Sequence, residues 1–300
     1  MGEPLTRPPA RILLDTDLAM GAPGSDIDDG FALALAIADP GLRLELVTTV
    51  GGNSDVVTST RLTHELLEVL GRTDVPVVQG APAGEEAARE IVGRVMAEPG
   101  ELTLVAIGPL TNVARALALE PALADAVHEI VVMGGVFLEQ TNVAAMPGEY
   151  NFWCDPEAAQ VVCESGAPLR FVGLDVTRRV RLSRGDARAL ADGGEFGRIA
   201  AGHTEGWISF QERVKPREEI EQGSCALHDP LAVAVVAHPE LCTWREAHVA
   251  VETRGRVTRG VAVADLLMWE DPPVPNCRIA TDVDAEGFRR LFVERMAALP

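Results

Sequence analysis

Short apolar runs, rich in β-branched residues, alternate with longer segments of helical spacing over the first 173 residues. The runs at 11–15, 43–50, 102–107, 129–133 and 169–173 predict strands, whereas 28–38, 56–70 and the segments that begin at residues 111 and 156 predict helices. Strands that are each followed by a helix are typical of parallel strands joined by crossover connections. The pattern therefore predicts an α/β protein whose open, mostly parallel sheet has helices on both faces.

The last third of the chain begins with a different pattern. Residues 183–222 have mixed charge, carry Trp207 and Phe210 at helical spacing and show no clear strand, so we expect a helical excursion there. A helix at 229–237, strands near 247–252, 260–266 and 278–281, and a closing helix at 284–298 follow. Because no linker-like segment or internal repeat interrupts the chain, we predict a single domain over 1–300, with residues 1–10 as a flexible tail.

Composition limits the possible partners. The 300 residues are 47% hydrophobic and 24% charged, which excludes a disordered chain. The net charge of −19, with Lys215 as the only lysine, argues against binding to nucleic acid. Apolar runs stop at about eight residues, too short to span a membrane, and residues 1–10 lack the apolar segment of a signal peptide. We therefore expect a cytoplasmic protein whose five cysteines, none in a CxxC pair, are reduced.

Five aspartates gather where the first predicted strand leads into the first helix. Asp15 and Asp17 end the strand, and Asp26, Asp28 and Asp29 open the helix. One of them can cap the helix, which leaves the others without a purpose unless they bind a cation. With no histidine or cysteine nearby, carboxylates alone suit a hard ion such as calcium or magnesium.

Two known acidic motifs fit these residues less well. An EF-hand loop that starts at Asp15 would need an acidic or amide side chain and then glycine where Ala19 and Met20 stand. A phosphatase of the haloacid dehalogenase type also begins with a strand and DxD, but it uses a downstream basic residue, typically lysine, and Lys215 lies in the charged helical stretch. The phosphatase is kept as an alternative.

Two further groups of residues suggest chemistry. His228 precedes Asp229 and Pro230, which are typical of a helix start, and an imidazole in a strand-to-helix loop can exchange protons near neutral pH. Glu149 and Asn151 lie two positions apart, so on an extended segment their side chains would project to the same side and present an acceptor and a donor together.

Seven motifs in one order resemble the nucleoside hydrolase family, of the inosine- and uridine-preferring kind. They are DTD with DIDD (15–29), VTTVGGN (47–53), GPLTN (108–112), VVMGG (131–135), GEYNFWCDPEAA (148–159), GLDVT (173–177) and HDPLAVA (228–234). The resemblance implies a Rossmann-like α/β fold and hydrolysis of the N-glycosidic bond of ribonucleosides to free base and ribose, with a calcium-bound water as nucleophile. We also expect a homodimer or homotetramer.

The resemblance implies roles for particular residues. It implies that Ca²⁺ is bound by Asp17, Asp29, Asp229 and the backbone carbonyl of Ile107. Asp17 would also accept the proton of the water, and His228 would protonate the leaving base. The residues that match substrate-binding positions, most of them against the ribose, are Asp28, Asn53, Met133, Asn142, Glu149, Asn151 and Asp229.

The chain departs from the family at LAMGAPGS (18–25), which separates DTD from DIDD by more residues than usual. We hypothesise that this insert bulges away and returns Asp28 and Asp29 to their usual places, while Asp26 caps or braces the loop. In the rival arrangement Asp26 itself binds calcium. Besides the phosphatase, the other alternative is a calcium-dependent riboside-binding protein without turnover, against which the presence of Asp17 and His228 argues.

Overall fold

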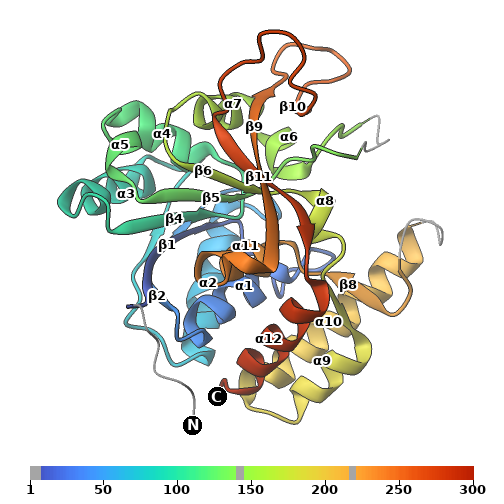
Figure 1. The fold of residues 1–300 in the computed structure, drawn as a ribbon. Coiled ribbons are helices and arrows are strands. Elements are labelled where there is room, and N and C mark those ends of the chain that lie inside the picture. The colour runs from blue at the N-terminus through green and yellow to red at the C-terminus, as the bar shows by residue number, and fades with distance from the viewer. Residues whose placement is uncertain (1–7, 140–144, 216–220) are drawn as a thin grey trace.

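A nine-stranded sheet forms the centre of the computed structural model, which describes residues 8–139, 145–215 and 221–300 (Figure 1). Six neighbouring pairs of strands are parallel, and only β9 runs antiparallel to its two neighbours. The predicted open, mostly parallel sheet is thereby confirmed. Across the sheet the strands are β10 (Ala262–Asp265), β9 (Cys242–Val251), β11 (Cys277–Val283), β6 (Leu169–Val172), β5 (Glu129–Met133), β4 (Leu102–Ala106), β1 (Ala10–Thr16), β2 (Leu42–Thr49) and β3 (Val77–Gln79).

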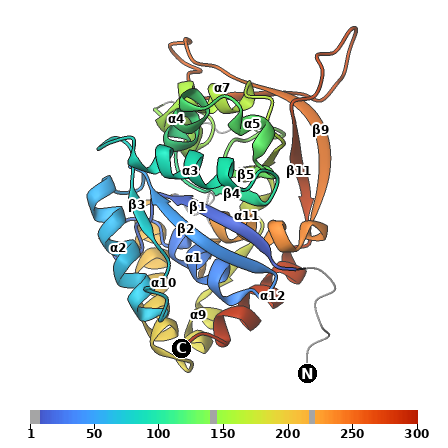
Figure 2. The same ribbon diagram turned by 90° about the vertical axis from the view of Figure 1, so that its left-hand side faces the viewer.

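Helices cover both faces of the sheet, because successive strand residues point to opposite sides (Figure 2). In β1, Ile12 and Leu14 join one buried cluster, whereas Leu13 joins the other. The first cluster lies under α1 (Asp28–Ala38), α2 (Val56–Val69), α11 (His228–Ala237) and α12 (Ala285–Ala297). The second lies under α3 (Glu86–Ala97), α4 (Thr111–Leu119), α5 (Leu123–Ala126) and α7 (Pro156–Cys163).

The helical excursion is confirmed. Helices α9 (Arg184–Ala191) and α10 (Glu195–Val214) pack against each other, and a small antiparallel pair, β7 (Arg181–Ser183) and β8 (Ser224–Ala226), brackets them. The shorter helices α6 (Tyr150–Cys154) and α8 (Leu174–Thr177) and the 3₁₀ turn η2 (Pro239–Leu241) complete the described elements. Among all the described residues, no helix combines the length and apolar character needed to cross a membrane.

Several elements differ from the sequence expectations. Strand β1 already includes Ala10, whose N–H donates to the Gly41 carbonyl at 2.8 Å, so this end of the expected tail belongs to the sheet. Pro8 and Pro9 precede the strand, and residues 1–7 of that tail lie outside the described residues. Strand β9 begins at Cys242 rather than near 247, because its first half pairs with β11. Strand β3 and helix α3 were not predicted.

The carboxyl ends of four neighbouring strands, β5, β4, β1 and β2, meet at one edge of the sheet. Met133 ends β5, Ile107 follows β4, Asp17 follows β1, and Asn53 lies in the turn after β2. Ligands of open parallel sheets bind at this edge, beside the amino ends of the helices. The fold therefore brings the sequence-predicted residues to the expected place.

Candidate active site

Three buried aspartates form the centre of the site. Asp28 and Asp29 are the first two residues of α1, and Asp229 is the second residue of α11, which packs against α1. One carboxylate oxygen from each lies within 4.8 Å of the others. Asp28 Oδ2 accepts the backbone N–H groups of His228 at 2.9 Å and Asp229 at 3.2 Å. The Asp28 carboxylate at the start of α1 thus holds the start of α11 in place.

Asp17 lies beside this cluster, at the end of β1. Its Oδ2 accepts the Asn53 N–H at 2.6 Å, whereas its Oδ1 is buried without a hydrogen-bond partner among the described residues. The turn after β2 comes very close, since a Cβ on Gly52 would stand 2.0 Å from Asp17 Oδ2. Only glycine permits that approach.

The cluster concentrates negative charge in a place with little water. Burial raises the pKa of Asp17, Asp28 and Asp229 well above the usual range, and repulsion between the carboxylates raises it further. The pKa of Asp29 is also raised by burial, although its Oδ1 accepts the Thr16 hydroxyl at 2.5 Å. Oxygen-only donors with one unpartnered oxygen fit a hard cation, which would hold these groups in their ionised form.

The middle of the inserted loop packs against α10 and α2, whereas Leu18 and Ser25 at its ends contact the turn that holds Asn53. A Cβ on Gly21 would touch His203, and one on Gly24 would touch Phe210. Asp26 is half-buried and interacts with the Asp28 side chain, its Oδ1 accepts the neighbouring Ile27 N–H at 2.7 Å, and partial burial raises its pKa to about 6. The expectation that one of the aspartates caps α1 is wrong, since the N-cap residue is Ile27 and no side chain caps this helix.

The expected extended segment over both Glu149 and Asn151 is wrong, because Asn151 already lies in α6 and only Glu149 is extended. It is the N-cap residue of α6, and its carboxylate accepts three backbone N–H groups, from Gly135 at 3.0 Å, Asn151 at 2.8 Å and Phe152 at 3.1 Å. The carboxylate therefore joins the loop after β5 to α6. Burial nevertheless raises the pKa of Glu149.

Asn151 connects two strand ends. Its side-chain amide donates to the carbonyl of Ile107 at 3.0 Å and to the carbonyl of Met133 at 3.1 Å. Both hydrogens of the amide are used in this way, which leaves its oxygen for other partners. The structure thus fixes the orientation of the Ile107 carbonyl, one of the expected metal ligands.

His228 is held by a residue that the sequence did not single out. Its Nδ1 lies 2.7 Å from the hydroxyl of Thr177, the last residue of α8. Burial, with the nearby positive charges of Arg178 and Lys215, lowers the pKa of His228 to about 3, so the imidazole is neutral at physiological pH. When the Thr177 hydroxyl donates to Nδ1, the ring proton resides on Nε2.

Asp15 has a structural task. Its Oδ1 accepts the Thr48 hydroxyl at 2.5 Å and the Asn112 side-chain amide at 2.8 Å, so it ties β1 to β2 and α4. Burial raises its pKa to about 6.

Thr16 and Thr177 stand inside the DTD and GLDVT motifs, but nothing in their residue type gave them a role. The expected ribose contact Asn142 lies outside the described residues.

A hollow of about 290 Å³ lies between the inserted loop and α10. Two aromatic side chains line it, with the Trp207 and Phe210 rings stacked at 5.6 Å and 12°. The Arg213 guanidinium lies 5.4 Å from the Phe210 centroid. Trp207 Nε1 is buried without a hydrogen-bond partner in the described chain. These groups suit a flat aromatic ligand with a polar edge.

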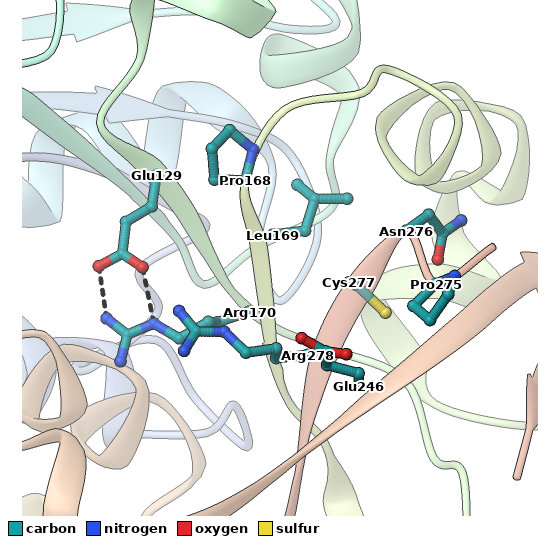
Figure 3. A pocket seen from close by; sticks show the side chains of 9 residues that line it. All are labelled: Glu129, Pro168, Leu169, Arg170, Glu246, Pro275, Asn276, Cys277 and Arg278. Carbon is teal, nitrogen blue, oxygen red and sulfur yellow. Dashed lines mark hydrogen bonds and ion pairs between the residues drawn. The ribbon is translucent and has the colours of Figure 1, made fainter.

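A second hollow, of about 220 Å³, lies near the opposite ends of the strands (Figure 3). The Arg170 guanidinium there forms a two-point ion pair with Glu129, the first residue of β5. Arg278 stands opposite Glu246 in the antiparallel ladder of β11 and β9. This second hollow contains none of the sequence-predicted residues and is therefore not part of the candidate active site.

An open α/β sheet with buried carboxylates at its carboxyl edge is typical of a metal-dependent enzyme. The family model described as inosine-uridine preferring nucleoside hydrolase matches residues 12–290. The chain therefore belongs to the inosine-uridine preferring nucleoside hydrolase family, and it is an enzyme that hydrolyses the N-glycosidic bond of ribonucleosides.

Individual relatives cover nearly the whole chain. A pyrimidine-specific ribonucleoside hydrolase, RihA of Enterobacter sp. (strain 638), is 34% identical over 95% of this chain and 97% of its own length. An uncharacterized protein of Schizosaccharomyces pombe is 31% identical over 97% of this chain and 100% of its own length. Among solved structures, the plant nucleoside hydrolase PpNRh1 has a TM-score of 0.86 at 28% identity and covers 97% of this chain and 100% of its own.

A purine-preferring ribonucleoside hydrolase of Gardnerella vaginalis has a TM-score of 0.83, also at 28% identity, over 96% of this chain and 98% of its own. The names of the relatives thus include both pyrimidine-specific and purine-preferring enzymes. The comparisons confirm the family and the fold class that the motifs predicted.

Proposed function

We propose that the enzyme hydrolyses ribonucleosides with a Ca²⁺ ion bound by Asp17, Asp29, Asp229 and the carbonyl of Ile107. The observation that supports this most directly is the buried Asp17 Oδ1, which has no partner among the described residues beside three other carboxylates. Calcium prefers carboxylate and carbonyl oxygens, and the described cluster offers no cysteine or imidazole as a softer ligand.

Asp28 has a different role in this proposal, although it lies within the same cluster. Its Oδ2 already accepts two backbone N–H groups, so its Oδ1 is assigned to the ribose. The other residues proposed to contact the substrate are Asn53, Met133, Asn142, Glu149, Asn151 and Asp229. When bound, the cation would neutralise part of the cluster and lower the pKa of a water molecule in the site.

The reaction then follows from the charges of the chain's own groups. Asp17 Oδ1 accepts a proton from the attacking water, whose oxygen forms the new bond to the anomeric carbon. The bond between that carbon and the base nitrogen breaks, and its electron pair leaves with the base. Positive charge that develops on the sugar is stabilised by the surrounding carboxylates, notably Asp28.

His228 assists the departing base from the other side of the bond. Its Nε2–H, set by the hydroxyl of Thr177 at Nδ1, can donate to a nitrogen or oxygen of the base as negative charge develops there. A neutral imidazole suits this task as a hydrogen-bond donor. Thr177 is then a positioning residue, because it acts only through His228.

The aromatic hollow beside α10 is proposed to receive the base. The stacked Trp207 and Phe210 rings offer a flat wall, and every nucleobase has a flat face to place against it. Because such a wall accepts purines and pyrimidines alike, the proposal concerns ribonucleosides as a class. Initial rates on inosine, uridine, cytidine, adenosine and guanosine would assign the preference.

Removal of the metal tests the proposal. Exhaustively chelated enzyme should release no ribose from the preferred nucleoside, and added Ca²⁺ should restore the release. Hydrolysis at the full rate without metal would overturn the role of the cation. Phosphate release from a phosphate ester would instead favour the DxD phosphatase, and nucleoside binding without ribose release would favour the non-catalytic binder.

The assembly and location of the enzyme are also proposals. We propose a homodimer or homotetramer that works in the cytoplasm. Sedimentation of the purified protein would measure the number of subunits, and fractionation of the source cells would show where the enzyme is located. A monomer, or recovery outside the cytoplasmic fraction, would contradict them.

A further inference from the structure

Tyr150 is the only tyrosine of the chain, and neither the sequence motifs nor the proposed function gives it a task. It is the first residue of α6, between Glu149 and Asn151. Its hydroxyl donates to the backbone carbonyl of Gly52 at 2.9 Å, across 98 positions of the chain. This hydrogen bond joins the start of α6, with its two proposed substrate contacts, to the turn after β2.

The same peptide group contacts Asp17 on its other side. The carbonyl of Gly52 and the N–H of Asn53 belong to one peptide bond, and that N–H donates to Asp17 Oδ2 at 2.6 Å. A trans peptide is planar, and its carbonyl and N–H point in opposite directions, so the orientation of one fixes that of the other. A continuous chain of hydrogen bonds therefore runs from the Tyr150 hydroxyl through the peptide to the Asp17 carboxylate.

Each hydrogen bond in this chain strengthens the next. A donor at the carbonyl draws electrons away from the N–H, which makes that N–H a better donor to a carboxylate. Because Oδ2 is held by the turn, the Asp17 carboxylate keeps one orientation. In this orientation its buried Oδ1 has no partner among the described residues and is left for the cation and the attacking water.

We propose that Tyr150 is a positioning residue of the reaction, whose hydroxyl orients the Gly52–Asn53 peptide and thereby the carboxylate of Asp17. The inference rests on the proposed function, because it takes Asp17 as a ligand of the cation and as the acceptor of the proton from the water. If Tyr150 only supported α6, its loss would instead weaken the binding of the substrate through Glu149 and Asn151.

The side chain of Tyr150 suits this role and allows a clean test. Burial, with the neighbouring Cys154, raises the pKa of Tyr150, so the hydroxyl remains protonated and able to donate. The ring lies beside that of Trp153, with 6.1 Å between the centroids. Tyr150→Phe keeps this ring contact and removes only the hydroxyl.

The first experiment compares the kinetics of Tyr150→Phe and wild type at saturating Ca²⁺. The variant should lose about fivefold to tenfold in kcat, as expected for one hydrogen bond, with KM within about twofold of wild type. The loss should be equal on inosine and on a nitrophenyl riboside, because every leaving group needs the attacking water. A raised KM with unchanged kcat would assign Tyr150 to the support of α6 and overturn the proposal.

The matched control is Ser165→Ala. It also removes a hydroxyl that donates to a backbone carbonyl, that of Val162 at 2.7 Å, but at the end of α7 and outside the candidate site. Its kcat and KM should equal those of wild type. Circular dichroism of both variants reports whether the fold is kept.

The second experiment measures hydrogen exchange of the Asn53 amide by NMR in metal-free protein. Tyr150→Phe should speed this exchange by about fivefold to tenfold, because the peptide loses the bond that orients it. The Ser59 amide of α2, which donates to the Asp55 carbonyl, should exchange as in wild type. An unchanged rate at Asn53 would overturn the proposal. If the variant does not fold, wild type alone decides, since an Asn53 amide that exchanges as fast as in an unfolded peptide would also overturn it.

The two experiments separate this inference from the proposed function. Full activity of chelated wild type would contradict the role of the cation, whatever the exchange rate at Asn53. A calcium-dependent wild type whose kcat and Asn53 exchange rate are both matched by Tyr150→Phe would contradict only the role of Tyr150.

Discussion

At the scale of single residues, the half-buried Asp26 and the buried Asp29 have different hydrogen-bond partners. Asp29 belongs to the three-aspartate cluster, whereas Asp26 accepts the N–H of Ile27 beside the inserted loop. We therefore expect Asp29→Ala to weaken calcium binding more than about tenfold, which is about 1.4 kcal/mol, and Asp26→Ala to change it only slightly. Calorimetric titration of Ca²⁺ into both variants measures this. The opposite order would show that Asp26 is the ligand.

His228 offers a second test at this scale. Its role in helping the base depart predicts that His228→Ala slows hydrolysis of nucleosides by about a hundredfold. The same variant should hydrolyse a nitrophenyl riboside almost normally, because that leaving group needs little assistance. Thr177→Val should show the same selectivity in weaker form, and Thr177→Ser, which keeps the hydroxyl, should resemble wild type. Equal losses on both substrates would remove His228 from this role.

Residue type and position predicted much of the candidate site, but not the partners of its side chains. Asp17, Asp28 and Asp29 were recognisable within a group of five aspartates whose mutual repulsion favours a bound cation, whereas their separate roles and Asp229 came from the resemblance to the family. The contact between Thr177 and His228 was not predictable, since the two residues lie 51 positions apart and threonine has many ordinary uses. Pairings of this kind depend on how α8 and α11 pack.

At the scale of elements, one ion cluster joins the ends of three helices. Asp39, which follows α1, accepts the His238 imidazole at 3.0 Å and lies 3.2 Å from Arg295 of α12. The hydrogen bond to Asp39 raises the pKa of His238. Burial alone would raise the pKa of Asp39, but the hydrogen bonds from His238, the Gly41 amide and Arg295 outweigh it and lower that pKa.

The sign of these shifts gives a prediction about pH. A raised folded-state pKa means that charged His238 stabilises the fold below its unfolded pKa of about 6.5, and that this contribution disappears as pH rises through the folded value. His238→Gln should therefore lower the free energy of unfolding more at about pH 6 than at about pH 9, by on the order of 0.5 kcal/mol, and this appears as a larger drop in melting temperature at the lower pH. The exposed His64→Gln on α2 is the control. Thermal melts that show equal losses at both pH values would contradict the prediction.

The elements that sequence patterns predicted are the ones with several buried residues in a row or at regular spacing. Strand β4, with all five residues buried, gives a clear signal. Strand β3 has three residues, all only partly buried, so its pattern resembles that of a loop. Helix α6 begins at Tyr150 because Glu149 caps it, and a five-residue helix leaves no periodic signal. Helix α3, with Ala87, Ala88, Ile91 and Val95 buried at helical spacing, could have been found.

At the scale of the whole molecule, the acidic cluster should make stability depend on calcium. Four buried carboxylates repel one another in the folded protein and separate on unfolding, so a cation that binds only the folded state stabilises it. At a calcium concentration about 100 times the Kd, this linkage is worth about 2.7 kcal/mol. We expect chelation to lower the melting temperature of wild type. Asp29→Ala should melt at nearly the same temperature with and without calcium, and a full calcium effect in that variant would contradict the assignment.

The class of the sheet was predictable from the sequence, whereas the order of its strands was not. Alternating strands and helices require parallel neighbours and crossover connections, as observed. Nothing along the chain, however, says that β11 lies between β6 and β9, because that order depends on contacts between segments more than 100 residues apart. The position of the inserted loop, likewise, depends on α10, α2 and the turn after β2.

The contact between Asp28 and the amides of His228 and Asp229 spans 200 positions of the chain, and this has a consequence for biosynthesis. While the ribosome is still making the middle of the protein, Asp28 and Asp29 exist without their partner from α11. A nascent chain therefore carries the negative charge of the site long before it can hold a cation. The proposed metal centre would therefore be completed late in folding, and calcium would stabilise only chains whose synthesis has passed residue 229.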